Sequence, residues 1–198
     1  MGEAYPPLGT TNYAPYFPAI RDAKPDFLYV NLLGSDAVTF LKQAAEFGLK
    51  SFKMIGPVSL VSEDVLFAQG DSAVGVYSIS YYSPTYDIPR NRWFAKAYRE
   101  FAKGKEPDHF NAAGFDAMQA LYGALKASKG EVANKDRLIE WIAANKIDSP
   151  RGPLRFDPGN HNPIQDLHVR IVESSPLRSV VVDTIKESTH PAGGCTLA

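Results

Sequence analysis

The sequence has 198 residues, of which 44% are hydrophobic and 22% are charged. This composition is typical of a globular chain with a buried core, and it excludes wholesale disorder. The 21 basic residues balance 22 acidic ones, so the charge indicates neither a nucleic-acid partner nor an anionic membrane surface. The single cysteine, Cys195, excludes a disulfide framework and a multi-thiolate metal site within one chain.

The first eighty residues alternate between helix and strand patterns. Helices are expected at 16–23, from Ser35 to a stop at Gly48, and from Ser62 to Gly70; strands are expected at 26–31, 51–56 and 74–82. The run 26–31 is mostly apolar, as in a strand buried on both faces. This order predicts an α/β fold with a parallel sheet and right-handed crossovers.

The rest of the chain has a different pattern. Three helices are expected in succession, at 90–103, 109–128 and 135–145, followed by strands at 152–156, 167–173 and 179–185. Helices without strands between them have no sheet of their own to pack on. We therefore expect a chain truncated at its N-terminus, or one that completes its fold as a homodimer or a strand-swapped dimer.

No catalytic or cofactor motif is present. The sequence contains no GxSxG, GxxxxGK[ST] or GxGxxG pattern, so we expect no enzyme and no cofactor. Asp36, Glu63 and Asp64 stand at helix starts, where the helix dipole accounts for carboxylates. His161 and His168 lie around a hairpin, either as turn and sheet-surface residues or as a metal pair.

The loops after the expected parallel strands are the places where an open sheet binds ligands. They are 31–35, 56–60 and 81–83, and the first two combine apolar side chains, small residues and free helix-start amides. Such a mixture fits a small ligand with an apolar body and a polar or anionic head. Alternatively, Leu32, Leu33 and Leu60 are core residues beneath the loops.

Several stretches together resemble one family. They are 26–30 with 40–44 and 48–50, then 114–121, and 149–157 with 161–166. In order and spacing they resemble the C-terminal part of a periplasmic solute-binding protein of the branched-chain amino acid ABC transporter type, over residues 2–172. The resemblance implies the type I periplasmic binding fold, in which two α/β lobes joined by three crossover strands close on a ligand.

The resemblance also implies a division of the chain. Residues 1–80 would form lobe two without its first strand and helix, and 81–148 would form the closing helices of lobe one. Residues 149–186 would return to lobe two, and 187–198 would be a flexible tail.

The ligand-binding residues implied by the resemblance lie in two loops and on one helix: Leu32, Leu33 and Gly34; Pro57, Val58 and Ser59; and Phe110. Amino-acid-binding members carry an acidic residue near the second loop, where this sequence has Val58 and Ser59. Burying an ammonium without a counter-charge is costly. We therefore expect an apolar or aromatic carboxylate in preference to an ordinary amino acid.

The function implied by the resemblance is non-enzymatic. It is the capture of a small solute in an interlobe cleft for an ABC permease in the membrane, in the periplasm, with the export signal outside this sequence. A ligand-sensing regulatory domain of the same fold is the alternative.

Overall fold

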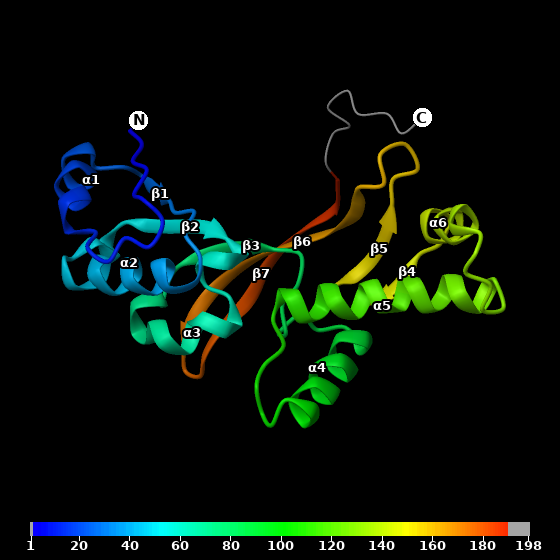
Figure 1. Cartoon of the computed structure of the whole chain (residues 1–198). Coiled ribbons are helices and arrows are strands. Elements are labelled where there is room, and N and C mark those ends of the chain that lie inside the picture. Colours follow the sequence, from blue (N-terminus) through cyan, green and yellow to red (C-terminus); the bar gives the residue numbers. More distant parts are fainter. Residues whose placement is uncertain (1, 190–198) are drawn as a thin grey trace. The chain divides into compact units, whose positions relative to one another are not determined.

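A computed structural model describes residues 2–189 (Figure 1). The predicted tail therefore lies outside the described residues from 190 on, Cys195 included. The helices are α1 (Phe17–Ala23), α2 (Gly34–Glu46), α3 (Glu63–Gln69), α4 (Pro89–Phe101), α5 (His109–Ala127) and α6 (Lys135–Ala144). The strands are β1 (Phe27–Tyr29), β2 (Lys53–Pro57), β3 (Tyr77–Ser80), β4 (Ile147–Ser149), β5 (Gly152–Phe156), β6 (Pro163–Ser174) and β7 (Leu177–Ser188).

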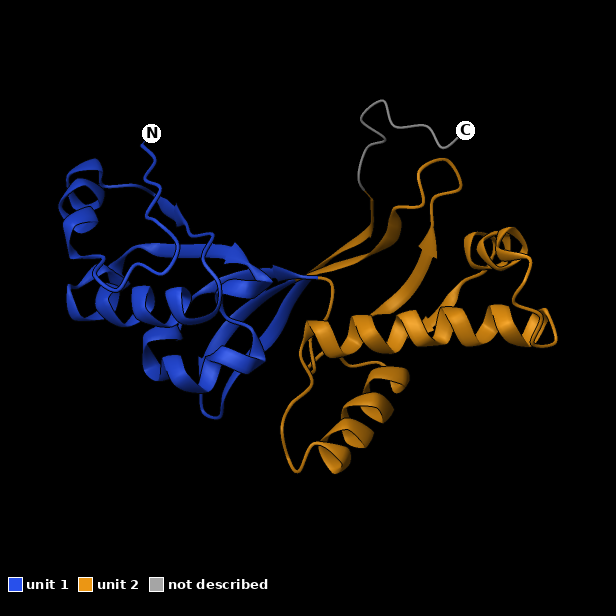
Figure 2. Cartoon of the chain, in the orientation of Figure 1, with its two compact units in different colours: residues 1–80, 169–183 blue, residues 81–168, 184–198 orange. Residues whose placement is uncertain are grey.

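The chain divides into two compact units (Figure 2). Unit 1 holds Met1–Ser80 and Val169–Asp183, and unit 2 holds Tyr81–His168 and Thr184–Ala198. Residues 149–186 are expected to return to lobe two with residues 1–80, whereas 149–168 belong to unit 2 with the helices. The reason is packing, because Ile147 and Leu154 share a core cluster with Ala120 of α5.

Unit 1 is built on three parallel strands. β1 pairs with β2 and β2 with β3, all parallel, with Leu28 opposite Met54 and Gly56 opposite Ser78. Residues of α2 and α3 pack with Met54, Val76 and Val172 in one core cluster on one side of the sheet. Parallel strands joined by right-handed crossovers place successive helices on the same side. The elements β1, α2, β2, α3 and β3 therefore follow the βαβαβ order expected from the sequence.

The other side of the unit 1 sheet is apolar and open among the described residues. Phe27 and Tyr29 are each 61% exposed and Ile79 is 37% exposed. They alternate along their strands with Leu28, Ser78 and Ser80, which face the core side. The prediction that the strand at 26–31 is buried on both faces is therefore wrong for this structure, because β1 is an edge strand covered on one face only.

Unit 2 surrounds the long helix α5. The strands β4, β5 and the first part of β6 pair antiparallel, and α6 packs on α5 at Gly123. A Cβ at Gly123 would lie 2.1 Å from Cη2 of Trp141, so this helix contact requires glycine. A second cluster of Tyr82, Phe94 and Ala112 joins α4 to α5.

The strands β6 and β7 run through both units. Along β6, His168 and Arg170 are fully buried, and Val172 is 2% exposed. The strand β7 continues to Ser188, so residues 187 and 188, expected in the tail, are paired strand. Polar residues in β6 are thus buried beside apolar ones: His168 packs on Tyr86, and Arg170 pairs with Glu63.

Candidate functional site

The two ligand loops predicted in unit 1 lie next to each other. β1 leads into Leu32–Gly34 and β2 leads into Pro57 and the single turn Val58–Leu60. The hydroxyl Oγ of Ser59 donates to the carbonyl oxygen of Leu32 across 3.4 Å. The strands beneath approach closely, because a Cβ on Gly56 would lie 2.3 Å from the carbonyl oxygen of Val30. The loops therefore form one continuous surface at the carboxyl edge of the sheet.

The three leucines of these loops differ in burial. Leu60 is fully buried in the core, Leu32 packs against that core while partly exposed, and Leu33 is 59% exposed. The alternative that these leucines are core residues beneath the loops therefore holds for Leu60 and not for Leu33. Leu33 precedes α2 in an extended conformation, and Gly34 begins the helix with a φ of 56°, a value that favours glycine.

The acidic residues near these loops are already engaged within unit 1. Asp36 is 6% exposed, and its Oδ2 accepts from the backbone N–H of Gly9 at 2.8 Å. Glu63 Oε1 lies 2.8 Å from Nη1 of Arg170, with side-chain exposures of 5% and 0%. The helix dipole alone does not explain why a carboxylate stands at position 63, because Glu63 also neutralises a buried arginine. Glu63 therefore offers no free counter-charge to a ligand ammonium, and Asp36 is buried below the loop surface.

Phe110, the remaining predicted site residue, lies in unit 2 at the second position of α5. A capping box fixes this helix start: Asn111 N–H donates to Asp108 Oδ1 at 2.8 Å, and Asp108 N–H donates to Asn111 Oδ1 at 2.9 Å. The Phe110 side chain is 67% exposed. An aromatic ring presented to solvent from a fixed helix start is suited to contact a ligand.

The sequence analysis missed a polar cluster in unit 2. Asp116 of α5 is 3% exposed, and its Oδ2 accepts from Oγ of Ser149 at 2.9 Å and from Nε of Arg151 at 2.6 Å. Burial raises the pKa of the Asp116 carboxyl, while Arg151 and Ser149 offset part of that effect. The burial of Asp116 could have been expected, because Asp116 falls within a four-residue repeat with the alanines at 112, 120 and 124; its contacts with Ser149 and Arg151 could not.

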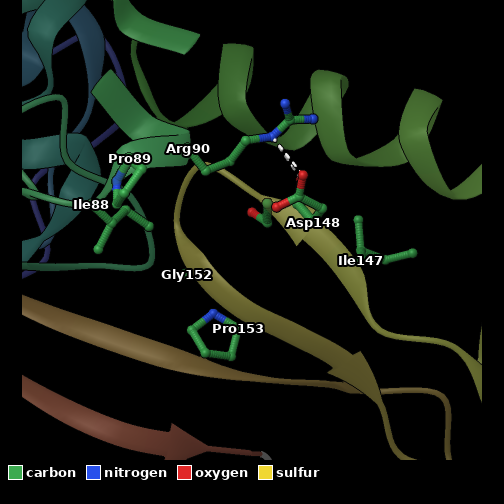
Figure 3. A pocket seen from close by; sticks show the side chains of 8 residues that line it. Ile88, Pro89, Arg90, Ile147, Asp148, Gly152 and Pro153 are labelled. Atoms are coloured by element: carbon green, nitrogen blue, oxygen red, sulfur yellow. Dashed lines mark hydrogen bonds and ion pairs between the residues drawn. The ribbon is translucent and has the colours of Figure 1, made fainter. Parts of the chain in front are cut away.

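A surface pocket of about 330 Å³ lies elsewhere in unit 2 (Figure 3). Arg90 and Asp148 form an ion pair at its wall, with Arg90 Nε 3.1 Å from Asp148 Oδ2. The guanidinium of Arg90 also lies 4.6 Å from the centroid of the Trp93 ring. None of the predicted ligand residues is among those that line this pocket: Ile88, Pro89, Arg90, Ile147, Asp148, Ser149, Gly152 and Pro153.

The histidines of the hairpin do not form a metal site with the residues that the structure describes. His168 is fully buried, with its ring 4.1 Å from that of Tyr86, so its interpretation as a sheet-surface residue is wrong. Within residues 2–189, no three His, Cys, Asp or Glu side chains gather as metal ligands would. Among the helices of this part of the chain, none combines the length and the hydrophobicity of a membrane span.

Unit 1 presents two loops at one edge of its parallel sheet, and unit 2 presents the exposed ring of Phe110. The chain passes between the two units three times. These features are typical of a two-lobe α/β binding fold. The family model described as periplasmic binding protein matches residues 1–175. The chain therefore belongs to the periplasmic binding protein family, and the expected type I fold of the branched-chain amino acid type is confirmed.

The relatives include amino-acid and aromatic-acid binders by name. The Leu/Ile/Val-binding protein homolog 6 of Brucella suis is 29% identical over 171 residues, covering 84% of this chain and 43% of that protein. A solute-binding protein of an ABC transporter from R. palustris, solved with benzoate, is 29% identical with a TM-score of 0.87, covering 96% of this chain and 51% of the other.

A solute-binding protein from Rhodopseudomonas palustris BisB5, solved with 3,4-dihydroxybenzoic acid, is 32% identical with a TM-score of 0.82, covering 91% of this chain and 50% of the other. The chain thus spans about half the length of the proteins it matches.

Proposed function

We propose that this chain supplies part of the ligand site of an extracytoplasmic solute-binding protein that serves an ABC permease. In this proposal unit 1 corresponds to lobe two and unit 2 to part of lobe one. The binding residues are Leu32, Leu33, Gly34, Pro57, Val58, Ser59 and Phe110. The alternative, a ligand-sensing regulatory domain, uses the same site and differs only in whether a permease follows.

The proposed ligand is a small carboxylate with an apolar or aromatic body. The observation that carries this proposal is the surface of the joined loops, where Leu33 is exposed and positions 57–59 carry no acidic side chain. Glu63 is neutralised by Arg170, and Asp36 is buried and accepts from Gly9, so neither carboxylate is presented on the loop surface to a ligand ammonium. The relatives solved with benzoate and 3,4-dihydroxybenzoic acid support an aromatic body.

Isothermal titration calorimetry with benzoate, 3,4-dihydroxybenzoate and leucine tests the proposal on the complete two-lobe binding protein, because this chain supplies only part of the site and we expect it to bind weakly by itself. We expect heat of binding with the two aromatic acids and weaker or absent binding with leucine. Removing the hydroxyl in Ser59→Ala loosens the contact between the loops and weakens benzoate binding.

Ser51→Ala is the matched control for this experiment. The hydroxyl of Ser51 also donates to a backbone carbonyl at 3.4 Å, that of Gly48, but it does not belong to the loops. We expect its benzoate affinity to equal that of the wild type. Leucine binding stronger than benzoate binding, or equal losses in the two serine variants, would contradict the proposal.

A further inference from the structure

Phe110 is the last residue in a row of side chains that contact one another within unit 2. Its ring centroid lies 4.0 Å from that of His109, with 36° between the planes. The His109 ring in turn meets the Tyr81 ring at 6.0 Å and 70°, and the guanidinium of Arg151 lies 4.7 Å from the centroid of Tyr81. These four residues, Arg151, Tyr81, His109 and Phe110, are called the Tyr81 row below.

One end of the Tyr81 row is fixed and the other is open. Arg151 Nε lies 2.6 Å from Asp116 Oδ2, and the two side chains are 11% and 3% exposed. The Tyr81 hydroxyl donates to the backbone carbonyl of His109 at 3.2 Å, so the row is tied to the first residue of α5. His109 is 5% exposed whereas Phe110 is 67% exposed. The Arg151 end of the row is therefore buried in an ion pair, and the Phe110 end is exposed to solvent.

We propose that Tyr81 is a positioning residue for the ligand site. It holds the His109 ring and the start of α5, and through them it sets the orientation of Phe110. The role of Phe110 rests on the function proposed above. A ring that is already oriented loses less side-chain freedom when a ligand binds. The affinity for an aromatic ligand then depends on Tyr81, a residue outside the predicted contact set.

The test compares Tyr81→Phe and Tyr81→Leu with the wild type, each in the complete two-lobe protein. Tyr81→Phe removes the hydrogen bond to His109 and keeps the ring, and Tyr81→Leu removes both. The first measurement is the NMR shift of the Phe110 ring protons, which the His109 ring current sets. The second is the dissociation constant for benzoate by calorimetry. We expect a moved Phe110 resonance in Tyr81→Leu and weaker benzoate binding in Tyr81→Phe, by at most about fivefold, the upper limit set by one net hydrogen bond.

Tyr82→Phe is the matched control, because it removes a hydroxyl from the next residue. The Tyr82 ring is fully buried and packs on Phe94 at 5.9 Å, in a cluster against which Tyr81 also packs, and no ring contact joins it to His109 or Phe110 among the described residues. A purely structural role for Tyr81 predicts equal changes in melting temperature and affinity for the two Tyr→Phe variants. The positioning role predicts that only Tyr81→Phe weakens benzoate binding.

The proposal and the function on which it rests fail in different ways. No benzoate binding by the complete two-lobe protein contradicts the proposed function. The Phe110 resonance then tests the positioning role of Tyr81 by itself. An unchanged Phe110 resonance in Tyr81→Leu overturns the positioning role, whatever the affinity. A moved resonance with unchanged benzoate affinity also overturns it, because Phe110 orientation would then have no effect on binding.

Discussion

The buried ion pair of unit 1 offers a direct test of how this unit is held together. Arg170 and Glu63 are 0% and 5% exposed in their side chains and lie 2.8 Å apart, and Arg170 Nε also donates to Oγ of Ser78 at 3.2 Å. The substitution Arg170→Met leaves the Glu63 carboxylate buried without its counter-ion, at a cost of about 3–5 kcal/mol. A domain has about 5–15 kcal/mol of stability in total, so we expect a severe loss.

Native-state hydrogen exchange assigns this loss to unit 1. The Val172 amide donates to the Val76 carbonyl at 3.1 Å, and its protection reports the free energy of unfolding locally. Arg178→Met is the matched control, because Arg178 pairs with Glu173 at 3.8 Å with both side chains about half exposed. Such a surface pair contributes no more than about 1 kcal/mol. Equal losses of Val172 protection in the two arginine variants would refute the reasoning.

Three further predictions concern packing, pH and the open sheet face. Gly56→Ala places a Cβ 2.3 Å from the Val30 carbonyl oxygen; we expect a loss of about 1–3 kcal/mol in urea unfolding, and an unchanged midpoint would contradict the close approach. Burial raises the folded-state pKa of Asp116, so its contribution to stability is present below the unfolded pKa of about 3.9 and is lost as the pH rises through the folded value. The unfolding free energy of the wild type should therefore fall relative to that of Asp116→Asn across this window, and a constant difference would argue against it. Exposed Phe27 and Tyr29 predict self-association; light scattering should show dimers that disappear in Phe27→Ser/Tyr29→Ser, and a monomeric wild type would count against dimerisation.

Local sequence signals located most of the elements. The strand expected at 152–156 is β5, and the helix expected at 109–128 is α5 within one residue. Spacing of apolar residues and helix-ending glycines are local properties, so they can be read along the chain. The strand β4, Ile147–Ser149, was not predicted because three residues carry too little pattern. It exists because β5 pairs with it.

Burial of polar residues could not be predicted from local patterns. In β6, alternation alone would bury Leu167, Val169 and Ile171, yet His168 and Arg170 are the fully buried residues. The partner of Arg170, Glu63, is 107 positions away in the sequence. Such a pair is identified only after the fold brings helix α3, which holds Glu63, next to strand β6, which holds Arg170.

The candidate site, too, was predictable only where local patterns indicate it. The rule that ligands bind at the carboxyl ends of parallel strands located both loops, and the structure shows that Ser59 and Leu32 are in contact. The Asp116–Arg151 contact joins residues of a helix and a distant turn, so no spacing in the sequence indicates it.

The central claim is that the joined loops of unit 1 bind an aromatic carboxylate. A titration of the ¹⁵N-labelled two-lobe protein with benzoate, followed by amide shifts, tests it residue by residue. The account predicts saturable shifts at Leu33, Gly34 and Ser59. Shifts confined to the pocket at Ile88 and Gly152 in unit 2, with the loop amides unmoved, would contradict it.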